Sequence, residues 1–311
     1  MVMSTIIIGA DGFIGRHLTA RLAQEGHGDL ALVCGRPTDG YLQQNFPASR
    51  VLEFSLADLD QMVELCSSAE TIFQLAWSTT PHTSNADPVA DFLNNALPNL
   101  RFIDALAPHF KGRLVFVSSG GAVYGVPQVL PIPESHPIHP LSSYGIGKSV
   151  VERYIELYGR LHGLVYTIVR VANPYGPGQT VKNTQGVIAA ILSCLRTGQP
   201  FTMWGDGSVI RDYVHVLDVA AALALAGRHE NARQETFNIG SGKGESLSGI
   251  IEIMERISKR KIAVNRLPPR KEDVPVNQLD ISKAKTHLNW TPAVQLEDGL
   301  CELIRTAVHE T

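Results

Sequence analysis

The sequence predicts an α/β protein in which a doubly wound parallel sheet is accompanied by a smaller carboxyl-terminal lobe. Short apolar runs alternate with amphipathic stretches through the first 171 residues. The runs are continuously apolar, which is typical of parallel strands that helices cover on both faces. After residue 173 this alternation gives way to loops rich in Pro and Gly, which indicates that a second lobe begins there.

The alternating elements can be assigned in order along the chain. The strands we expect are Thr5 to Ile8, Leu30 to Cys34, Thr71 to Ala76, Arg113 to Ser118 and Val165 to Val171. The helices expected between them are Phe13 to Gln24, Leu59 to Cys66, Val89 to Leu106 and Ser143 to Leu161. Further on we expect helices at Gln185 to Thr197, Val216 to Ala226, Leu247 to Ser258 and Leu296 to Val308, with strands at Glu235 to Ile239 and Lys261 to Asn265.

This pattern suggests how the chain is divided into domains. We assign residues 1–172, together with a segment near 212–240, to a dinucleotide-binding domain. Residues 173–211 and 241–311 form the expected substrate-binding lobe. The length of 311 residues is ample for both, because domains commonly span roughly 100 to 200 residues.

Charge and composition exclude several classes of partner. The chain has 27 Lys+Arg against 30 Asp+Glu, a formal net charge of −3, and no run of basic residues. Nucleic acid and anionic membrane surfaces are therefore not expected as partners, and the ligand should be a small molecule. No apolar run approaches the ~18 residues that span a bilayer, and the amino terminus lacks a signal sequence, so we expect a cytoplasmic protein. The four cysteines form no CxxC pair, and we expect buried, reduced thiols.

A glycine-rich turn joins the first expected strand to the first helix. Its residues are Gly9, Gly12, Phe13, Ile14 and Gly15, in the pattern Gly-x-x-Gly-x-x-Gly. Glycines there allow a tight turn and the close approach of a pyrophosphate, which the helix amino terminus then binds. A purely structural turn is the alternative. The position of the turn at the head of a βαβ series favours dinucleotide binding and a Rossmann-type fold.

The residue that normally selects NAD is missing. In Rossmann-type folds an acidic residue about 20 positions after the turn binds the ribose hydroxyls. Here the second expected strand ends in Val33-Cys34-Gly35-Arg36. Arg36 could receive the 2′-phosphate of NADP or could be a solvated loop residue, so these residues leave the choice between NAD and NADP open.

Tyr144 and Lys148 are the expected catalytic pair. They are four residues apart at the start of an expected helix, so their side chains share one helix face. A nearby ammonium group favours the phenolate form of a tyrosine and can lower its pKa toward the working range of a general base. The pair follows a strand ending in Ser118 and Ser119, whose hydroxyls should lie at the carboxyl edge of the sheet, where ligands bind.

With these features the chain resembles the extended short-chain dehydrogenase/reductases, in particular the nucleotide-sugar epimerase/dehydratase branch that includes UDP-galactose 4-epimerase. The resemblance runs nearly end to end. Its motifs are the glycine turn, Phe73–Ala76, Ser118–Gly125, Tyr144 with Lys148, Arg170–Gln179, Trp204–His215, Phe237–Gly240 and Arg270–Pro275. They are specific for the branch and not for one substrate.

The resemblance implies a role for each matching residue. Tyr144 would be the catalytic base, Lys148 its electrostatic partner and a ribose contact, and Ala76 and Ser118 would line the cofactor pocket. Asn173, Arg211 and Arg270 would bind the substrate diphosphate or sugar, with Trp204 and Arg211 near the nucleotide. Arginine suits that role because its guanidinium binds phosphate oxygens in pairs. Asn173 could instead cap a turn before Pro174, and Arg270 could be a solvated loop charge.

The chain departs from the family pattern at three places. The family's catalytic Ser or Thr corresponds to Gly120, so the hydrogen bond to the sugar hydroxyl has to come from another group. Ser119 is the expected one, and a backbone group or a residue not identified from the sequence is the alternative. An adenine-contacting Asp is replaced within Phe54-Ser55-Leu56, and the ribose acid is absent, as described above.

The resemblance implies an NAD-dependent epimerase that inverts C4 of a nucleotide-linked sugar through a transient 4-keto intermediate. On the basis of the family, the expected substrate is a UDP-hexose. An NADPH-dependent nucleotide-4-ketosugar reductase is the main alternative, and a non-catalytic dinucleotide-binding sensor is a remote one. A dehydratase is disfavoured because Gly120 to Ala122 offer no carboxylate. Family members commonly dimerise through the long helices, so the resemblance implies a homodimer. The apolar positions available for it are Leu93, Leu97, Leu100, Val150, Tyr154 and Leu157, although the core of the protein would use the same stripe. His136 and His139 lack a third ligand, so we expect a solvent-exposed pair and no metal.

Overall fold

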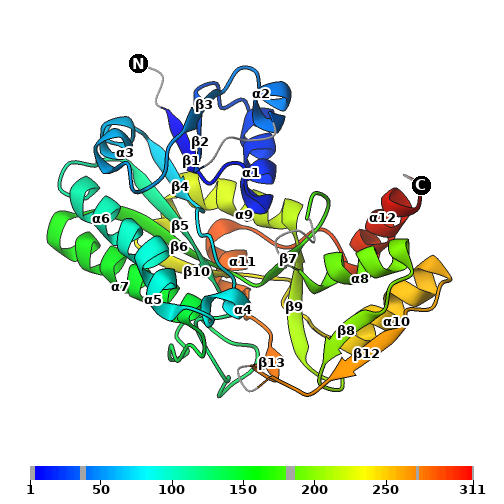
Figure 1. The fold of residues 1–311 in the computed structure, drawn as a ribbon. Helices are drawn as coiled ribbons and strands as arrows, with labels where there is room; N and C mark the ends of the chain where they lie inside the picture. The colour runs from blue at the N-terminus through cyan, green and yellow to red at the C-terminus, as the bar shows by residue number, and fades with distance from the viewer. Residues whose placement is uncertain (1–3, 36–39, 180–185, 271–272, 310–311) are drawn as a thin grey trace.

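A seven-stranded parallel sheet forms the centre of the molecule (Figure 1). The computed structural model describes residues 4–35, 40–179, 186–270 and 273–309. The sheet order is β3-β2-β1-β4-β5-β6-β10, and every neighbouring pair is parallel. Its strands are β1 (Thr5–Ile8), β2 (Leu30–Cys34), β3 (Arg50–Glu53), β4 (Thr71–Gln74), β5 (Arg113–Ser119), β6 (Val165–Val171) and β10 (Glu235–Ile239). The strand order reverses between β1 and β4, which is where ligands bind in doubly wound sheets.

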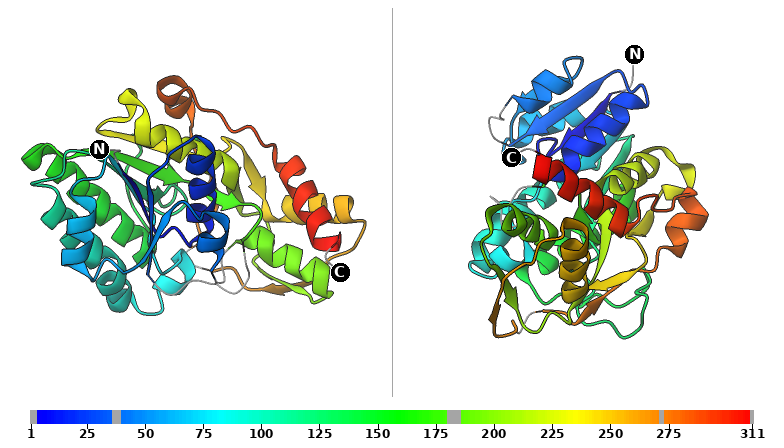
Figure 2. Two further views of the ribbon diagram at one scale, coloured as in Figure 1. Left: turned by 90° about the horizontal axis from the view of Figure 1, so that it is seen from above. Right: turned by 90° about the vertical axis from the view of Figure 1, so that its right-hand side faces the viewer.

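Helices cover both faces of this sheet (Figures 1 and 2). Successive residues of β1 divide between two cores, since Ile7 packs into one hydrophobic cluster while Ile6 and Ile8 pack into the other. This is the burial that continuously apolar strands predict. One face is covered by α1 (Phe13–Gln24) and α9 (Val216–Arg228), and the other by α3 (Leu59–Cys66), α6 (Leu97–Leu106) and α7 (Ser143–His162). The expected doubly wound parallel sheet is confirmed.

The long helix expected at Val89 to Leu106 is not a uniform α-helix. It consists of α5 (Pro88–Asp91), a π-helical turn at Phe92–Ala96 and α6. The π turn carries Asn95, which is 3% exposed and accepts hydrogen bonds from the Ser78 amide and hydroxyl. Such turns often occur at functional sites, and this one places a helix side chain against the loop that follows β4.

Several short elements were absent from the expected list. They are α2 (Tyr41–Asn45), α4 (Pro81–Ser84), α11 (Ser282–Leu288), β3, β7 (Asn173–Tyr175), β8 (Phe201–Trp204), β9 (Ile210–His215), β11 (Gly244–Ser246) and β13 (Val276–Asn277). The strand expected at Lys261 to Asn265 is β12 (Val264–Leu267). The expected lone strand Glu235 to Ile239 is β10, which pairs with β6 at the edge of the main sheet.

A second lobe is built around two small sheets (Figure 1). In one of them β9 pairs with β7, β11 and β13, and in the other β8 pairs with β12. Helices α8 (Val187–Thr197), α10 (Leu247–Ser258) and α12 (Leu296–His309) share an apolar core with these strands, including Ile191, Met203, Ile250 and Leu300. The residue boundaries that we assigned to the two domains stay a prediction.

Two expectations about individual side chains were wrong in part: the buried Cys34 and Cys66 and the exposed His139 agree with them, and three other residues do not. Cys34 and Cys66 are buried as expected, but Cys194 is only half-buried and Cys301 is exposed on α12. His136 is 5% exposed: its Nε2 accepts from the Gln128 amide, and its Nδ1 bonds to the Pro137 carbonyl. The ring therefore stabilises the loop after β5 instead of facing solvent.

In the described part of the chain no helix is long and apolar enough to cross a bilayer.

Candidate active site

The glycine turn packs the chain closely against itself, and a side chain at Gly9 or Gly15 would collide with backbone atoms. Gly9 has φ +86°, and a Cβ there would lie 2.9 Å from the Ala76 nitrogen at the end of β4. A Cβ on Gly15 would lie 2.2 Å from the Gly9 carbonyl oxygen. Helix α1 begins at Phe13 after Gly12, with no side chain capping its first turn. The turn thus presents backbone and a helix amino terminus at the point where the strand order reverses, which suits a pyrophosphate.

The remaining residues of the turn support its shape. Phe13 packs edge-on against His17, with ring centroids 5.7 Å apart, and Ile14 packs partly buried against the core. Ala76 lies beside Gly9, and its amide donates to the Gln74 side chain at 3.3 Å. Arg36, which we considered for cofactor selection, lies outside the described residues.

Tyr144 and Lys148 lie on the first turns of α7. The helix begins after Ser142, whose hydroxyl accepts from the Gly145 amide at 3.2 Å. Lys148 is 3% exposed, and its Nζ donates to the Val117 carbonyl of β5 at 2.7 Å. Tyr144 is half-buried, with its backbone amide donating to the Ser84 hydroxyl at 3.0 Å. The structure therefore brings the pair together at the carboxyl end of β5.

Burial moves the pKa values of the two groups in opposite directions. It raises the pKa of Tyr144 to about 12; hydrogen bonding to Ser119 lowers that pKa, and the charge of Asp91 raises it further. Burial also lowers the pKa of Lys148 to about 7, and the charge of Glu152 opposes this fall. Without a further positive charge, Tyr144 is a phenol at neutral pH. A base at this position therefore requires a cation beside it.

Ser119, and not position 120, faces the tyrosine. The Ser119 hydroxyl hydrogen-bonds Tyr144. A Cβ on Gly120 would instead lie 2.5 Å from Cδ1 of Leu279, on the other side of the chain. A Cβ on Gly121 would be 3.8 Å from the Asn173 amide and 3.9 Å from the Ser119 hydroxyl. A hydroxyl side chain at position 120 would therefore point into the core, so its absence leaves no gap beside Tyr144.

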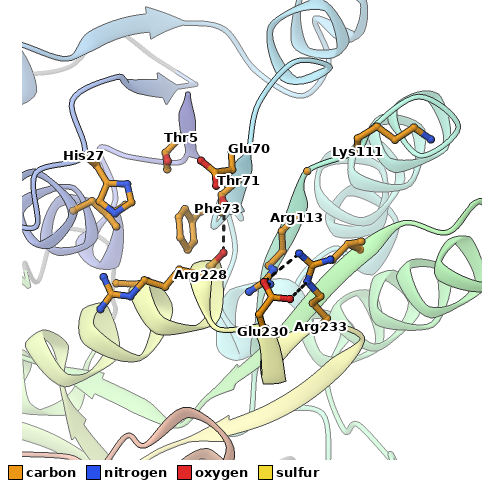
Figure 3. Close-up of a pocket in the computed structure, with 15 residues that line it drawn as sticks. Thr5, His27, Glu70, Thr71, Phe73, Lys111, Arg113, Arg228, Glu230 and Arg233 are labelled. Carbon is orange, nitrogen blue, oxygen red and sulfur yellow. Dashed lines mark hydrogen bonds and ion pairs between the residues drawn. The ribbon is translucent and has the colours of Figure 1, made fainter. Parts of the chain in front are cut away.

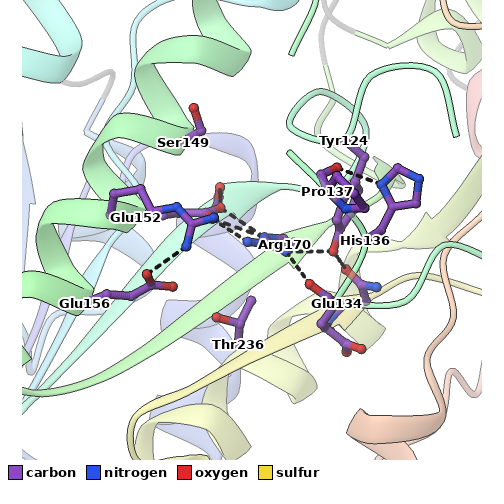
Figure 4. A network of polar contacts seen from close by, with 12 residues as sticks. Tyr124, Glu134, His136, Pro137, Ser149, Glu152, Glu156, Arg170 and Thr236 are labelled. Carbon is purple, nitrogen blue, oxygen red and sulfur yellow. Dashed lines mark hydrogen bonds and ion pairs between the residues drawn. The ribbon is translucent and has the colours of Figure 1, made fainter. Parts of the chain in front are cut away.

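Glu152, Arg170 and Tyr124 form a buried polar network (Figure 4), and Ser118 is hydrogen-bonded to it. The Ser118 hydroxyl donates to Glu152, which is 0% exposed on α7. Arg170 of β6 binds the same carboxylate through Nη2 at 2.7 Å and Nε at 3.2 Å. Arg170 also donates to the Tyr124 hydroxyl at 2.9 Å, which in turn donates to Asn238 of β10. The network joins α7 to three strands, while the expected contact of Ser118 with a cofactor stays a prediction.

The expected substrate residues come mainly from the second lobe. Asn173 opens β7, and its amide donates to the Asp212 carbonyl at 3.3 Å, close to Gly121. Arg211 of β9 is 20% exposed, donates to the Val274 carbonyl at 2.6 Å and lies 4.0 Å from Asp273. Arg270 stacks over the ring of Trp204 at 4.2 Å, and that ring is 38% exposed. The structure thus brings Asn173 to Ser119 and pairs Arg270 with Trp204.

Sequence reasoning missed the residues that hold the pair in place. Trp77, directly after Ala76, lies against both Tyr144 and Lys148. Asp91 is 3% exposed and accepts from Thr79, Asn95 and Ser143. A signal was available for Glu152, which is four residues after Lys148 and so shares its helix face. Trp77 and Asp91 carried no comparable signal, because their contacts join loops distant in sequence.

A cavity of about 190 Å³ lies at the opposite, amino-terminal edge of the sheet (Figure 3). Arg113 is 5% exposed there and donates to the Ala226 and His229 carbonyls at the end of α9. Glu230 is shared between Arg113 and Arg233. These groups neutralise one another and the helix carboxyl terminus, so the cavity is structural. No cluster of three metal-binding side chains occurs among the residues described.

A cradle for a dinucleotide and a Tyr-Lys pair on the same sheet edge define a dinucleotide-dependent α/β enzyme. Residues 5–240 match the model of the NAD dependent epimerase/dehydratase family, and the chain belongs to this family. It is 34% identical over 302 residues, 96% of each chain, to a putative UDP-glucose 4-epimerase of Methanocaldococcus jannaschii. It is 30% identical to a dTDP-4-dehydro-6-deoxyglucose reductase of Escherichia coli, over 97% of this chain and 96% of that protein.

A solved structure supports the same assignment. The UDP-glucose 4-epimerase of Thermus thermophilus in complex with NAD has a TM-score of 0.90 to this chain at 29% identity, covering 99% of this chain and 100% of that one. The protein is an enzyme of the nucleotide-sugar epimerase type, and NAD is its cofactor. The tight glycine turn and the uncapped amino terminus of α1, at the point where the strand order reverses, fit the pyrophosphate of that cofactor.

Proposed function

We propose that the protein interconverts UDP-hexoses by inverting C4 of the sugar through a transient 4-keto intermediate. The observation that carries the proposal is the placement of Tyr144, Lys148 and Ser119 at the edge of the sheet next to the glycine turn. NAD, when bound, supplies the oxidant for C4 and returns the hydride to it. The protein supplies orientation, proton transfer and charge.

Tyr144 is the proposed general base. Its hydroxyl oxygen would take the proton of the C4 hydroxyl during oxidation and give it back after the sugar turns in the site. Hydrogen bonding to Ser119 already lowers the pKa of the phenol. A positive charge that arrives with the cofactor would lower it further, toward the range in which a base works at neutral pH.

Lys148 is the proposed electrostatic partner of Tyr144. Its ammonium group lies 5.8 Å from the centroid of the tyrosine ring, within the pocket that desolvates it. An attraction between ammonium and phenolate is strong where water is excluded. Because Glu152 keeps the Lys148 pKa from falling further, it helps to retain this charge.

The second lobe would bind the nucleotide diphosphate. Arg211 and Arg270 offer guanidinium groups, which bind phosphate oxygens in pairs. Trp204 lies beneath Arg270 and is exposed enough to stack on a ring. Asn173 lies between this lobe and Ser119, where a sugar hydroxyl would be positioned. Relatives named for UDP-glucose support UDP as the nucleotide.

A nucleotide-4-ketosugar reductase is the second candidate. The relative from Escherichia coli that bears such a name aligns with 97% of this chain. The same Tyr144 and Lys148 would then donate a proton to a 4-keto group. In that case a reduced cofactor would be consumed once per turnover instead of being regenerated.

The test separates these two candidates. The protein is purified without added cofactor, denatured, and the released nucleotide is identified by mass spectrometry, while the native protein is incubated with UDP-galactose and followed by proton NMR. We expect retained NAD and conversion to UDP-glucose without added cofactor. Absence of conversion, together with oxidation of added NADPH by a dTDP-4-keto-6-deoxy sugar, would replace the epimerase with the reductase.

We also propose that the enzyme is a homodimer. Helices α6 and α7 pack together on one side of the sheet (Figure 1). The outer face of α7 exposes Tyr154 at 41%, Leu157 at 40% and Leu161 at 63%, and the π-helical turn that precedes α6 exposes Leu93 at 52%. An exposed apolar strip on two neighbouring helices is typical of a protein interface. Light scattering of the wild-type protein should give the mass of a dimer. Leu157→Lys should convert this dimer to a monomer, whereas the control Val129→Lys, in an exposed loop, should leave it dimeric. A monomeric wild type would contradict the proposal.

A further inference from the structure

Trp77 contacts both members of the catalytic pair. It follows Ala76 beyond the carboxyl end of β4. The Nζ of Lys148 lies 4.1 Å from the centroid of its indole ring, and the ring of Tyr144 meets the indole edge-on with centroids 5.8 Å apart. Gly147 permits this approach, since a Cβ there would lie 3.0 Å from the Trp77 ring.

The edge of the indole is anchored to the helix that carries Tyr144. The Trp77 Nε1 donates to the Thr79 hydroxyl at 3.2 Å, and this hydroxyl donates to the Asp91 carboxylate at 2.5 Å. The other oxygen of Asp91 accepts from the Ser143 hydroxyl at 2.7 Å. Ser143 precedes Tyr144 in the chain. The indole is therefore fixed at its face by Lys148 and at its edge by a chain of hydrogen bonds that returns to α7.

We propose that Trp77 is a positioning residue of this site, whose indole face holds the Lys148 ammonium group beside Tyr144. The inference deepens the proposed function and rests on it. An ammonium group over the face of a tryptophan is attracted by the ring quadrupole, and this attraction is stronger when the cation is desolvated. Lys148, at 3% exposed, is such a cation.

An indole serves this purpose better than a carboxylate would. The charged groups around the pair are Glu152 on α7, Asp91 on α5 and Arg170, which is bound to Glu152. The negative charge of Asp91 raises the pKa of Tyr144, which disfavours phenolate. A second carboxylate beside Lys148 would add to that effect, whereas the neutral indole stabilises the ammonium without opposing the phenolate.

Two substitutions test the effect on turnover. Trp77→Leu removes the π face and should lower kcat about tenfold, the effect of losing a partly desolvated cation–π contact, with little change in KM. Trp77→Phe keeps a smaller ring and should recover part of the loss. A wild-type kcat for Trp77→Leu would overturn the inference, and so would Trp77→Phe being as slow as Trp77→Leu, because phenylalanine keeps a π face that leucine lacks.

A spectroscopic test needs no turnover. The tryptophan emission of the purified protein, measured against pH, should show a step as Lys148 titrates beneath the indole. Lys148→Met and Trp77→Phe should each abolish the step, and Trp290→Phe should retain it because Trp290 is buried against Asp218. Absence of the step in the wild type, or its persistence in Lys148→Met, would contradict the proposed contact.

Tyr144→Phe separates this inference from the proposed function. Full turnover by Tyr144→Phe would refute the proposed function. The pH-dependent step in tryptophan emission would still test whether Lys148 contacts the Trp77 indole. If Tyr144→Phe is inactive and Trp77→Leu is as fast as wild type, the role of Trp77 alone is refuted.

Discussion

The sheet edge at Tyr144 and the second lobe at Trp204 hold their cations in contrasting ways. At the sheet edge, Lys148 and Arg170 are 3% exposed each, and their donors are bound to Val117, Glu152 and Tyr124. In the second lobe, Arg270 lies over a partly exposed ring, and Arg211, whose side chain is 20% exposed, is 4.0 Å from Asp273. The first region fixes its charged groups inside the protein with charged and polar partners, while the second keeps its arginines at least partly exposed and more weakly paired.

This difference matches the proposed division of labour. A residue that transfers a proton has to be held within hydrogen-bonding distance of one atom, and a rigid buried network provides that precision. Residues that bind a diphosphate have to exchange water for ligand oxygens, so they remain accessible. Substitutions in the first region should therefore change stability or kcat, and substitutions in the second should change KM.

The largest stability effect is expected at the buried ion pair. Arg170→Met leaves the carboxylate of Glu152, at 0% exposed, without its charged partner, and should reduce the free energy of unfolding by about 3–5 kcal/mol in urea denaturation. Arg256→Met removes a pair with Glu297 whose side chains are 61% and 55% exposed, and should reduce the free energy of unfolding far less, because water screens an exposed pair. Equal losses in the two variants would contradict this account of the buried network.

The pH dependence of stability should report Lys148. Its pKa is lowered from 10.5 to about 7, so between these values the unfolded chain holds a proton that the folded chain has released. The free energy of unfolding should therefore rise with pH across this window, by at most about 1.4 kcal/mol per pH unit for one group. Tyr144, whose pKa is raised from 10.0 to about 12, acts with the opposite sign only above pH 10. Urea titrations of Lys148→Met should lack the rise; parallel curves for wild type and variant would refute the assignment.

Position 120 should affect packing and not chemistry. Gly120→Ser would bring its Cβ to 2.5 Å from Leu279, and should destabilise the protein by about 1–3 kcal/mol without raising kcat. Gly121→Ala is the matched control, because its Cβ would meet Asn173 at an ordinary 3.8 Å. An increase in kcat for Gly120→Ser would show that a hydroxyl at this position reaches the substrate.

The smallest effect should come from the second lobe. Arg270→Gln should raise KM for the nucleotide sugar about tenfold, the size of one charge-assisted hydrogen bond, and leave kcat and the melting temperature unchanged. Arg266→Gln, an exposed arginine on the adjacent strand β12, should behave as wild type. A fall in kcat for Arg270→Gln would contradict the proposal that the sheet edge determines kcat and the second lobe determines KM.

Local patterns in the sequence predicted the fold class and the catalytic pair. The long parallel strands are marked by apolar runs such as Thr5 to Ile8, and the spacing of Tyr144 and Lys148 fixes their shared helix face whatever surrounds them. Short strands such as β7, with three residues, and β13, with two, carry too few positions for a pattern. Their pairing with β9 is decided by tertiary contacts.

The environment of the pair could not be predicted in the same way. Trp77 and Asp91 act through contacts between segments that are distant in the chain. Glu152 lies on the same helix as Lys148. The direction of the backbone at Gly120 likewise depends on how the chain leaves β5, which the glycine itself does not specify. Sequence patterns thus identified the reacting groups and Ser119, but not Asp91 and Glu152, whose charges also shift the pKa values of the pair.

The most direct test of the central claim is the turnover of UDP-galactose by Tyr144→Phe, measured by NMR together with the NAD content of the purified variant. Removing a general base should lower the rate of interconversion by about 10²–10⁴-fold, while the variant retains NAD at the wild-type ratio. Interconversion at the wild-type rate, with NAD still bound, would show that Tyr144 is not the group that takes the proton.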